Sequence, residues 1–519
     1  MSVARRPVVG LIGFSLCLIA PARAQLIQVK TLPLAQGNQF QIFPSANLGM
    51  ASVSIALADS VLDPFVNPAT GSRVQAARFF GSPTVYSVSQ GTGGGRSLPL
   101  ALLARRANWY GGLALAVQQV DPSRPPQSDG VVTFETPGLP PPPGGGPFGP
   151  GQVPVQPNNE THGNQFAFGM IGRSLPDHHL SIGASVLWNG LHAVDGVDLL
   201  YANSRRLEQS GDALDLRVGA LKEWPTDSGK GGGARSLQAM LLHNRFASTH
   251  TVTYADVIWN PITQQFDEQA RIEHNEERTN TWGLQLNYQI PLKAPGWRIG
   301  WLAVANRASH PKIPTYELTN VPAIPRDPGY THAFNLGLGV SRVEGPARFG
   351  IDLIYEPISS YTWADAAVPT PTAAGDTIAA GGKTIENRFR FNNAWFRLGV
   401  EQPVEEGAPT SFQLGLILHP IQYRLEQRDN VQLFSRRVDA AWWEWTPTWG
   451  LSYRQPRFEL RYQGRATKGA GRPQAQLLIG PIRALDAAGS TILAAPTGPL
   501  FMTDVSTVTH QISISLPLR

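Results

Sequence analysis

The chain has 519 residues, of which only 16% are charged, and it is rich in glycine (52) and proline (44). This length exceeds that of a usual single domain, so it predicts either several domains or one large barrel. The formal net charge is +5, and it falls to about +2 when the three arginines of the first 24 residues are left out. Positive and negative residues are then nearly balanced, and no stretch of the sequence is strongly basic. Both observations argue against nucleic-acid binding.

The first 24 residues are predicted to be a secretory signal peptide. Two arginines precede the apolar stretch 8–20, and Ala22-Arg23-Ala24 supplies a small-residue cleavage site. Cys17, the single cysteine, lies within the apolar stretch and would leave with the signal peptide. The mature chain is therefore expected to contain no disulfide, no thiol metal site and no thiol nucleophile.

Residues 25–72 are rich in small residues and only weakly periodic. They contain an acidic step, Ala58-Asp59-Ser60, and then Asn67-Pro68-Ala69, in which Asn-Pro favours a turn. From these residues alone, an ordered N-terminal lead-in and a functional segment fit equally well. The motif resembles that of outer-membrane barrels of the FadL type and of the related PorV-like proteins, although Thr70 precedes the glycine that usually follows it. The resemblance implies that 25–72 form a hatch with Asp59, Asn67, Pro68 and Ala69 as its motif, and that 73–519 form the barrel that this hatch plugs.

From residue 73 onward the chain repeats an alternation of apolar and polar residues. In 281–292 the apolar parity is occupied by Trp282, Leu284, Leu286, Tyr288, Ile290 and Leu292. Such alternation predicts a β-strand with one apolar face, and about 9–11 tilted residues cross a bilayer. The clear segments are 109–120, 163–173, 179–189, 213–224, 236–259, 266–292, 297–306, 334–340, 349–356, 394–401, 412–418, 449–453, 458–462 and 512–518, and the weaker ones are 73–89 and 97–105.

The clear segments number 14, and the weaker pair raises the count to 16. Short and long connections alternate, as in outer-membrane barrels with short periplasmic turns and long extracellular loops. We therefore predict an all-β fold, a transmembrane antiparallel barrel of 14 or 16 strands in the lipid bilayer of the bacterial outer membrane. A tandem of soluble β-sandwiches is the alternative. The chain departs from most such barrels at its C-terminus, which ends Leu516-Pro517-Leu518-Arg519 and not on an aromatic residue.

Charged residues on the polar parity are the candidates for facing the lumen. They are Asp215, Arg217, Asp352, Glu356, Arg397, Glu401, Glu459 and Arg461. Both signs occur among them, so they could pair across the lumen and hold a hatch through charge-assisted hydrogen bonds. This mixture favours a plugged lumen over an open pore, which commonly separates charges by sign.

No catalytic or cofactor motif is present. The glycine-rich stretches 91–96 and 229–231 lack the Gly-Lys-Ser/Thr ending of a phosphate-binding loop, and Ser185 lacks the second glycine of a nucleophile elbow. Residues 273–278 contain one histidine and three glutamates, but strand geometry places His274 and Glu276 away from the other two, so we interpret them as a solvated strand extension. We therefore expect no enzyme, no metal and no cofactor.

The resemblance implies passive uptake of small hydrophobic compounds, such as fatty acids or hydrocarbons, through a barrel gated by its hatch. The alternative is a structural or partner-binding barrel of the PorV-like kind without transport activity.

Overall fold

The computed structural model describes residues 39–91, 93–122, 162–197, 204, 206–224, 234–260, 262–310, 316–318, 321–324, 328–366, 368–473 and 502–518. The predicted signal peptide and the first part of the segment 25–72 lie outside these residues. None of the described helices is long and apolar enough to cross a membrane.

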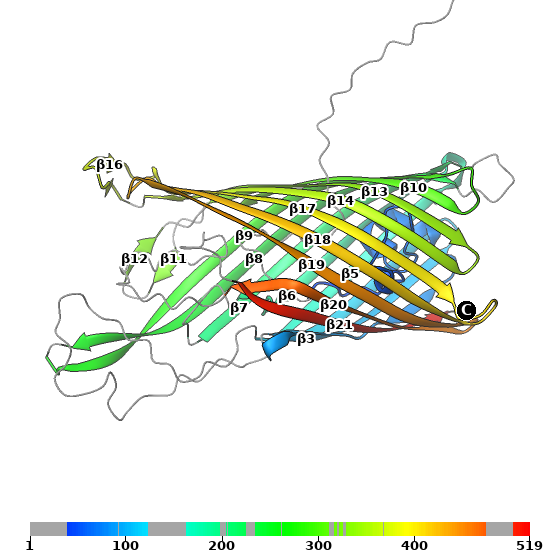
Figure 1. Ribbon diagram of the computed structural model, residues 1–519, viewed down its shortest axis with the longest axis horizontal. Coiled ribbons are helices and arrows are strands. Elements are labelled where there is room, and N and C mark those ends of the chain that lie inside the picture. The colour runs from blue at the N-terminus through cyan, green and yellow to red at the C-terminus, as the bar shows by residue number, and fades with distance from the viewer. Residues whose placement is uncertain are drawn as a thin grey trace, which may run out of the picture.

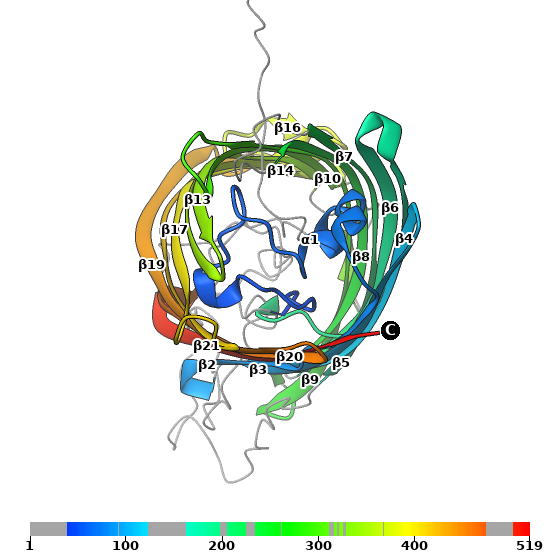
Figure 2. The same ribbon diagram turned by 90° about the vertical axis from the view of Figure 1, so that its right-hand side faces the viewer.

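One antiparallel sheet closes on itself to form a barrel of 16 strands (Figures 1 and 2). Closure is made by β1 (Arg78–Gly81) and β2 (Thr84–Val88), which both pair with β21 (Met502–Pro517) on one side and with β3 (Gly94–Arg106) on the other. Because β1 and β2 follow each other along the same two neighbours, they act as two halves of one wall strand. The weaker predicted strands are therefore real, and the count is 16, not 14.

Each remaining wall strand pairs with its sequence neighbour, which is the up-and-down arrangement that alternating turns and loops predict. They are β4 (Trp109–Asp121), β5 (His162–Leu175), β6 (Leu180–Leu191), β7 (Arg206–Trp224), β8 (Arg235–Asn260), β9 (Gln265–Pro291), β10 (Trp297–His310), β13 (Gly329–Glu344), β14 (Ala347–Asp365), β17 (Lys383–Pro403), β18 (Thr410–Asp429), β19 (Phe434–Gln455) and β20 (Phe458–Pro473). The small strands β11 (Tyr316–Leu318) and β12 (Val321–Ile324) pair with each other, and β11 adds to the sheet beside β9. The strands β15 (Thr370–Pro371) and β16 (Thr377–Ile378) form a separate pair, and the 3-10 turns are η3 (Ser89–Gly91) and η4 (Pro176–His178).

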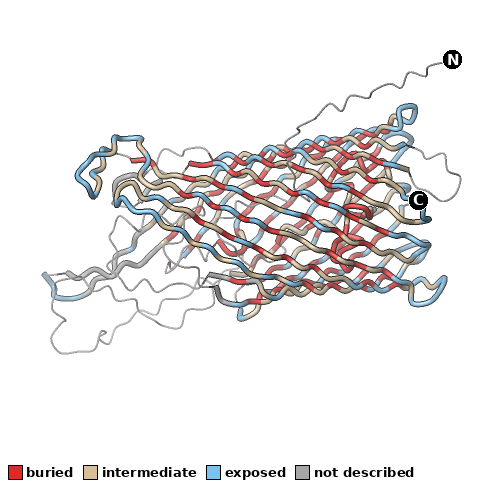
Figure 3. The backbone as a smooth tube through the Cα atoms, turned by 45° about the horizontal axis from the view of Figure 1, so that its top comes forward, coloured by how far each residue is buried: buried red, intermediate tan, exposed pale blue. Residues whose placement is uncertain are grey.

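The outer surface of the wall is apolar. On β4, Leu113, Leu115 and Val117 are 65%, 67% and 59% exposed, whereas Ala114 and Ala116 between them are buried. Buried and exposed residues alternate in this way along the strands (Figure 3). Large apolar side chains exposed in a continuous band would be unstable in water, so this band faces lipid.

Several strands continue well past the predicted segments. β17 begins at Lys383 and not at 394, β19 begins at Phe434 and not at 449, and β20 runs on to Pro473. The extension of β17 was missed because it has arginine at the outward positions 388 and 390 and phenylalanine at the inward positions 389 and 391, which inverts the alternation on which prediction depends. In the extension of β19, Trp442 lies inward and Trp443 and Trp445 outward, so apolar residues occupy both parities.

The first 39 described residues, 39–77, run inside the barrel (Figure 2) and are called the lumen segment below. The segment contains η1 (Leu48–Met50), the four-residue helix α1 (Asp63–Val66) and η2 (Pro68–Arg73). At its start, Gln39 lies at the long-loop ends of β4 and β6, where its carbonyl oxygen accepts from Gln118 Nε2 at 2.6 Å and its own Nε2 donates to Ala193 O at 2.7 Å. From η1 onward most of its wall contacts lie nearer the short turns, which are the periplasmic end of an outer-membrane barrel. An aromatic cluster anchors it there, since Phe43 stacks on Phe65 with ring centroids 4.6 Å apart and both rings pack against Phe168 of β5.

Candidate functional site

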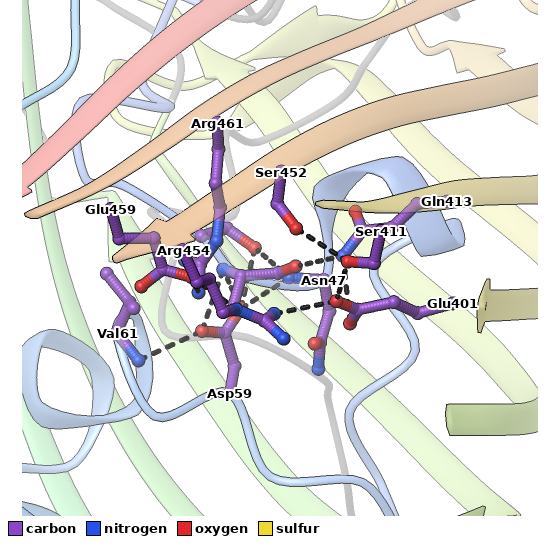
Figure 4. A network of polar contacts seen from close by, with 12 residues as sticks. Asn47, Asp59, Val61, Glu401, Ser411, Gln413, Ser452, Arg454, Glu459 and Arg461 are labelled. Atoms are coloured by element: carbon purple, nitrogen blue, oxygen red, sulfur yellow. Dashed lines mark hydrogen bonds and ion pairs between the residues drawn. The ribbon is translucent and has the colours of Figure 1, made fainter. Parts of the chain in front are cut away.

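Asp59 organises the fold of the lumen segment. Its carboxylate is buried and accepts hydrogen bonds from Ser45 Oγ at 2.6 Å and from the backbone N–H groups of Ala46 at 2.9 Å, Val61 at 3.1 Å and Leu62 at 3.0 Å (Figure 4). Hydrogen bonds to an ionised acceptor are the strong ones. One carboxylate therefore joins the two arms of the segment, those before and after it in the chain.

The Asn-Pro-Ala motif forms the start of η2. Asn67 is its N-cap and accepts a hydrogen bond from Ala69 N at 3.1 Å, while Pro68 occupies the first helical position, where a missing N–H costs nothing. The motif lies against the wall at Gly183 of β6 and Gly219 of β7. A Cβ on Gly183 would stand 2.8 Å from the Pro68 carbonyl, and one on Gly219 would collide with Asn67 Oδ1.

Other inward-facing glycines allow the same close approach elsewhere on the wall. A Cβ on Gly300 of β10 would lie 2.6 Å from Ile55 O, and one on Gly415 of β18 would lie 2.5 Å from Ala51 N. The lumen segment therefore packs backbone against backbone along much of the wall.

Asp215 and Arg217 of β7 hold the end of α1. They form a buried bidentate pair with distances of 2.7 and 2.8 Å, and Arg217 Nη1 also donates to the carbonyl oxygens of Phe65 and Val66, both at 3.1 Å. A cation at the carbonyl end of a helix is favourable. This pair thus docks the segment through its last helical carbonyls.

Asp352 of β14 holds a second backbone stretch. It accepts from Ser54 N at 2.8 Å and from Ile55 N at 3.3 Å. In register opposite Asp352 lies Arg397 of β17, which is buried and whose Cζ lies 5.3 Å from the ring centroid of Trp395.

Glu356, two inward positions further along β14, belongs to the wall alone. It accepts from Asn335 Nδ2 at 3.2 Å and from Asn393 Nδ2 at 3.1 Å. Among its hydrogen bonds within the described residues, none reaches the lumen segment.

The remaining three candidates form one cluster with Arg454 (Figure 4). Arg454 donates to Glu401 at 2.6 Å and to Glu459 at 2.6 Å, Arg461 donates to Glu459 at 2.7 Å, and Ser411 donates to Glu401 at 2.7 Å. Sequence analysis did not single out Arg454, which lies on the same polar parity of β19 as Ser452. The charges thus pair within the wall.

Two glutamines connect this cluster to the lumen segment. Gln413 Nε2 donates to Ala46 O at 2.9 Å, and Gln463 Nε2 donates to the same oxygen at 3.3 Å and is 1% exposed. The second oxygen of Glu401 accepts from Gln413 at 3.2 Å. The wall therefore holds the arm before Asp59 by neutral amides that the charged cluster positions.

A polar crevice separates the lumen segment from β8, β9 and β10. Its volume is about 50 Å³, which is enough for a few water molecules. It is lined by Ser52, Val53, Ser54, Ile55, Asp59, Leu62, Asp63, Val66, Asn67, Gln238, Gln285, Asn287, Gln289 and Leu302. The glutamines and the asparagine of 281–292 therefore face the lumen, and Gln289 donates to Ile55 O at 2.8 Å.

Toward the long loops the inward surface becomes apolar. Phe389 and Phe391 of β17 and Tyr423 of β18 are fully buried on the parity of Arg397 and Glu401. The cluster, called the apolar wall below, comprises Ala333, Ile358, Phe389, Phe391, Ile421, Tyr423 and Leu425, with Val438, Ala440 and Trp442 packed against it. Sequence analysis missed it because inward positions were sought by their polarity. Following one parity along all of β17 would have revealed the change.

Below the apolar wall, His419 of β18 stacks on Trp395 with ring centroids 3.5 Å apart and bonds Glu444 through Nδ1 at 2.9 Å. No group of three or more His, Cys, Asp or Glu side chains in the described part of the chain is arranged to hold a metal ion. The histidine of 273–278 contacts Thr251 at 3.2 Å, and Glu276 pairs with Arg278 at 3.1 Å.

No family model matches this sequence, and no curated protein matches it either. Solved structures similar to the chain include a FadL homologue of Pseudomonas aeruginosa, with 11% identity, a TM-score of 0.44 and coverage of 93% of this chain and 100% of that one. The toluene transporter TbuX of Ralstonia pickettii has 10% identity and a TM-score of 0.38, covering 92% and 100%. The CymD monoaromatic hydrocarbon channel has 13% identity and a TM-score of 0.33, covering 93% and 99%. At these values the likeness carries no conclusion about function.

The chain's own geometry defines its class. A closed 16-strand barrel with a lipid-facing apolar band is an outer-membrane β-barrel. Its lumen is occupied by the segment 39–77, which begins beside Gln118 and Ala193 on the side of the long loops and makes most of its other wall contacts nearer the short turns.

Proposed function

We propose that this barrel takes up small hydrophobic compounds passively across the outer membrane, with the segment 25–72 as its gating hatch. The observation that carries the proposal is the contrast between the two halves of the lumen. The apolar wall supplies a surface for a hydrophobic compound on the side of the long loops. The hatch closes the other half through hydrogen bonds, which can be exchanged for water when it moves, and through the packing of Phe43 and Phe65 on Phe168, which must separate.

In this proposal, a compound enters from the long-loop side and takes the place of the groups that now cover the rings of Phe389, Phe391 and Tyr423, which are buried. Moving the compound out of water into these apolar surroundings is favourable and requires no energy source. Passage onward needs a shift of the hatch, since the crevice of about 50 Å³ is too small for a hydrocarbon ring. The polar lining of that crevice lets water follow the hatch as it moves.

A disulfide between hatch and wall tests the gating. Val53 Cβ lies 3.4 Å from the place where a Cβ on Gly350 of β14 would stand, close to the mean of about 3.8 Å in disulfides. We expect Val53→Cys/Gly350→Cys, when oxidised, to abolish uptake of a labelled aromatic hydrocarbon or fatty acid into liposomes, and reduction to restore it. The predicted mature chain has no other cysteine, so the two single-cysteine variants are matched controls.

The same assay separates the two functions. If uptake does not exceed that of empty liposomes in either redox state, the barrel does not transport these compounds and the partner-binding alternative takes its place. If the locked barrel transports as fast as the reduced one, the hatch is not the gate.

A further inference from the structure

A row of three polar side chains crosses the outer face of β14, β17 and β18. Ser359 is in register with Arg390, and Arg390 is in register with Arg424. All three point away from the lumen, since their strand neighbours are buried in the apolar wall, namely Ile358 beside Ser359, Phe389 and Phe391 beside Arg390, and Tyr423 and Leu425 beside Arg424. Ser359 and Arg390 are exposed, and the Arg424 side chain is 40% exposed.

The two arginines of this row face each other without a counterion between them. Like charges placed directly opposite in an antiparallel pair are destabilising. Arg424 Nε bonds Asp439 at 2.7 Å, but Asp439 also pairs with Arg437 at 2.5 Å, so one carboxylate serves two guanidinium groups. Within the described residues, no hydrogen bond or ion pair engages Arg390.

The nearest other acid is also shared. Glu426 of β18 is in register with Arg388 on one side and with Arg437 on the other, and it is only diagonal to Arg390. The outward surface of β17, β18 and β19 here therefore holds more positive than negative groups. The excess is concentrated where Arg390 meets Arg424.

The position of the row on the barrel determines what kind of anion can reach it. On the same strands, nearer the short turns, the outward positions are apolar, with Leu353 54% and Leu414 53% exposed. The row thus lies just beyond the lipid-facing band, on the side of the long loops. An anion attached to acyl chains would place its chains against the band and its charged group at the row.

We propose that Ser359, Arg390 and Arg424 bind a phosphate group of the phosphorylated glycolipid of the outer leaflet. Two guanidinium forks and one hydroxyl match the oxygens of a phosphate, which accepts bidentate hydrogen bonds from arginine. The phosphate separates the two arginines and neutralises both. Free inorganic phosphate has no apolar part for the neighbouring band, so the lipid is the favoured occupant.

Native mass spectrometry of the full-length protein in detergent micelles tests this site. Diphosphorylated lipid A, its dephosphorylated form and inorganic phosphate are titrated separately. The wild type should bind the diphosphorylated form at least about tenfold more tightly than the dephosphorylated one, and Arg390→Gln/Arg424→Gln should lose this preference. Arg342→Gln is the matched control, because Arg342 is an outward, exposed arginine near the short turns and should leave the preference unchanged.

The single variant Arg390→Gln removes a side chain that no ion pair holds within the described part of the chain, so it should keep the fold and still weaken binding several-fold. A double variant that retains the wild-type preference would overturn the proposal. Equal binding of both lipid forms would overturn it as well. Inorganic phosphate binding as tightly as diphosphorylated lipid A would overturn the assignment to a lipid.

Discussion

Inward-facing glycines set how closely the lumen segment approaches the wall. Four glycines of the wall leave room for the lumen segment, namely Gly183, Gly219, Gly300 and Gly415. At each of them, the Cβ of any other residue would stand 2.8 Å or less from an atom of the segment. Such contacts need no side-chain ordering, so they fix the position of the segment at little entropic cost. The position of the segment therefore depends partly on glycines in the wall, because their lack of a Cβ allows the close contact.

The substitution Gly219→Ala tests this at a single residue. Its new Cβ would collide with Asn67 Oδ1, so Asn67 must leave its N-cap position and η2 must move. We expect local destabilisation of ~1–3 kcal/mol, as for other overpacked sites. Hydrogen exchange should accelerate in peptides covering 59–73 while peptides of the wall strands stay protected.

Gly169→Ala is the matched control. A Cβ at this outward position of β5 would make only ordinary contacts, 3.7 Å from Leu113 Cδ2 and 3.9 Å from Val186 Cγ1. It should leave exchange in 59–73 unchanged. Equal exchange in the Gly219→Ala protein and the wild type would show that the segment is not held by this contact.

At the scale of elements, β17 and β18 each present two inward surfaces. Near the short turns they carry Arg397, Glu401 and Gln413, whereas nearer the long loops they carry Phe391 and Tyr423. Strand geometry keeps all of these on one face. A single pair of strands therefore lines both halves of the lumen.

Phe391→Ala and Phe396→Ala form a matched pair on this strand. Phe391 is 1% exposed within the apolar wall, whereas Phe396 has the opposite parity and faces lipid. Contact with one phenyl ring is worth at least ~1.5 kcal/mol, so Phe391→Ala should lower the initial rate of hydrocarbon uptake into liposomes by about tenfold. Phe396→Ala should transport at the wild-type rate. Equal loss in both variants would mean that barrel stability, and not the apolar wall, limits uptake.

The fold could be predicted because strand alternation is local. The face of each residue in 281–292 follows from its parity, and the exposed Trp282 and buried Gln289 agree with it. The two weak strands were harder to predict, since β1 is only four residues long and is separated from β2 by Ser82 and Pro83.

The contacts of the site could not be predicted in the same way. Parity placed Arg217 on a polar face but could not show that it reaches Phe65 O, 152 positions away in the sequence. Register between distant strands and the path of the lumen segment decide such contacts, and neither is encoded locally. Arg454 became visible as a partner of Glu401 and Glu459 only when the strands were side by side.

For the whole molecule, the wall is expected to be stable without the lumen segment. Asp215 stays paired with Arg217, and Arg454 stays paired with Glu401, because these ion pairs lie within the wall. Removing the segment would therefore expose these ion pairs to water, and few charged side chains of the wall would lose their partner. The strand pairing between β21 and the β1/β2 strand starts only at Arg78, and of the segment itself only Ala77 takes part, by accepting from Leu518 N at 2.7 Å.

Deleting 25–72 behind the predicted signal peptide tests the division into hatch and barrel. We expect the variant to insert and to keep the heat-modifiable mobility of a folded barrel, because closure depends on strand pairing alone. Its lumen would be lined near the short turns by charged and amide groups, which support a hydrated pore. Ion conductance across planar bilayers should therefore rise from background in the wild type to discrete open-channel steps in the variant.

The Val53→Cys/Gly350→Cys protein, when oxidised, should stay at background, which separates loss of the hatch from its immobilisation. A deletion variant that folds but does not conduct would show that the segment 25–72 is not what closes the lumen.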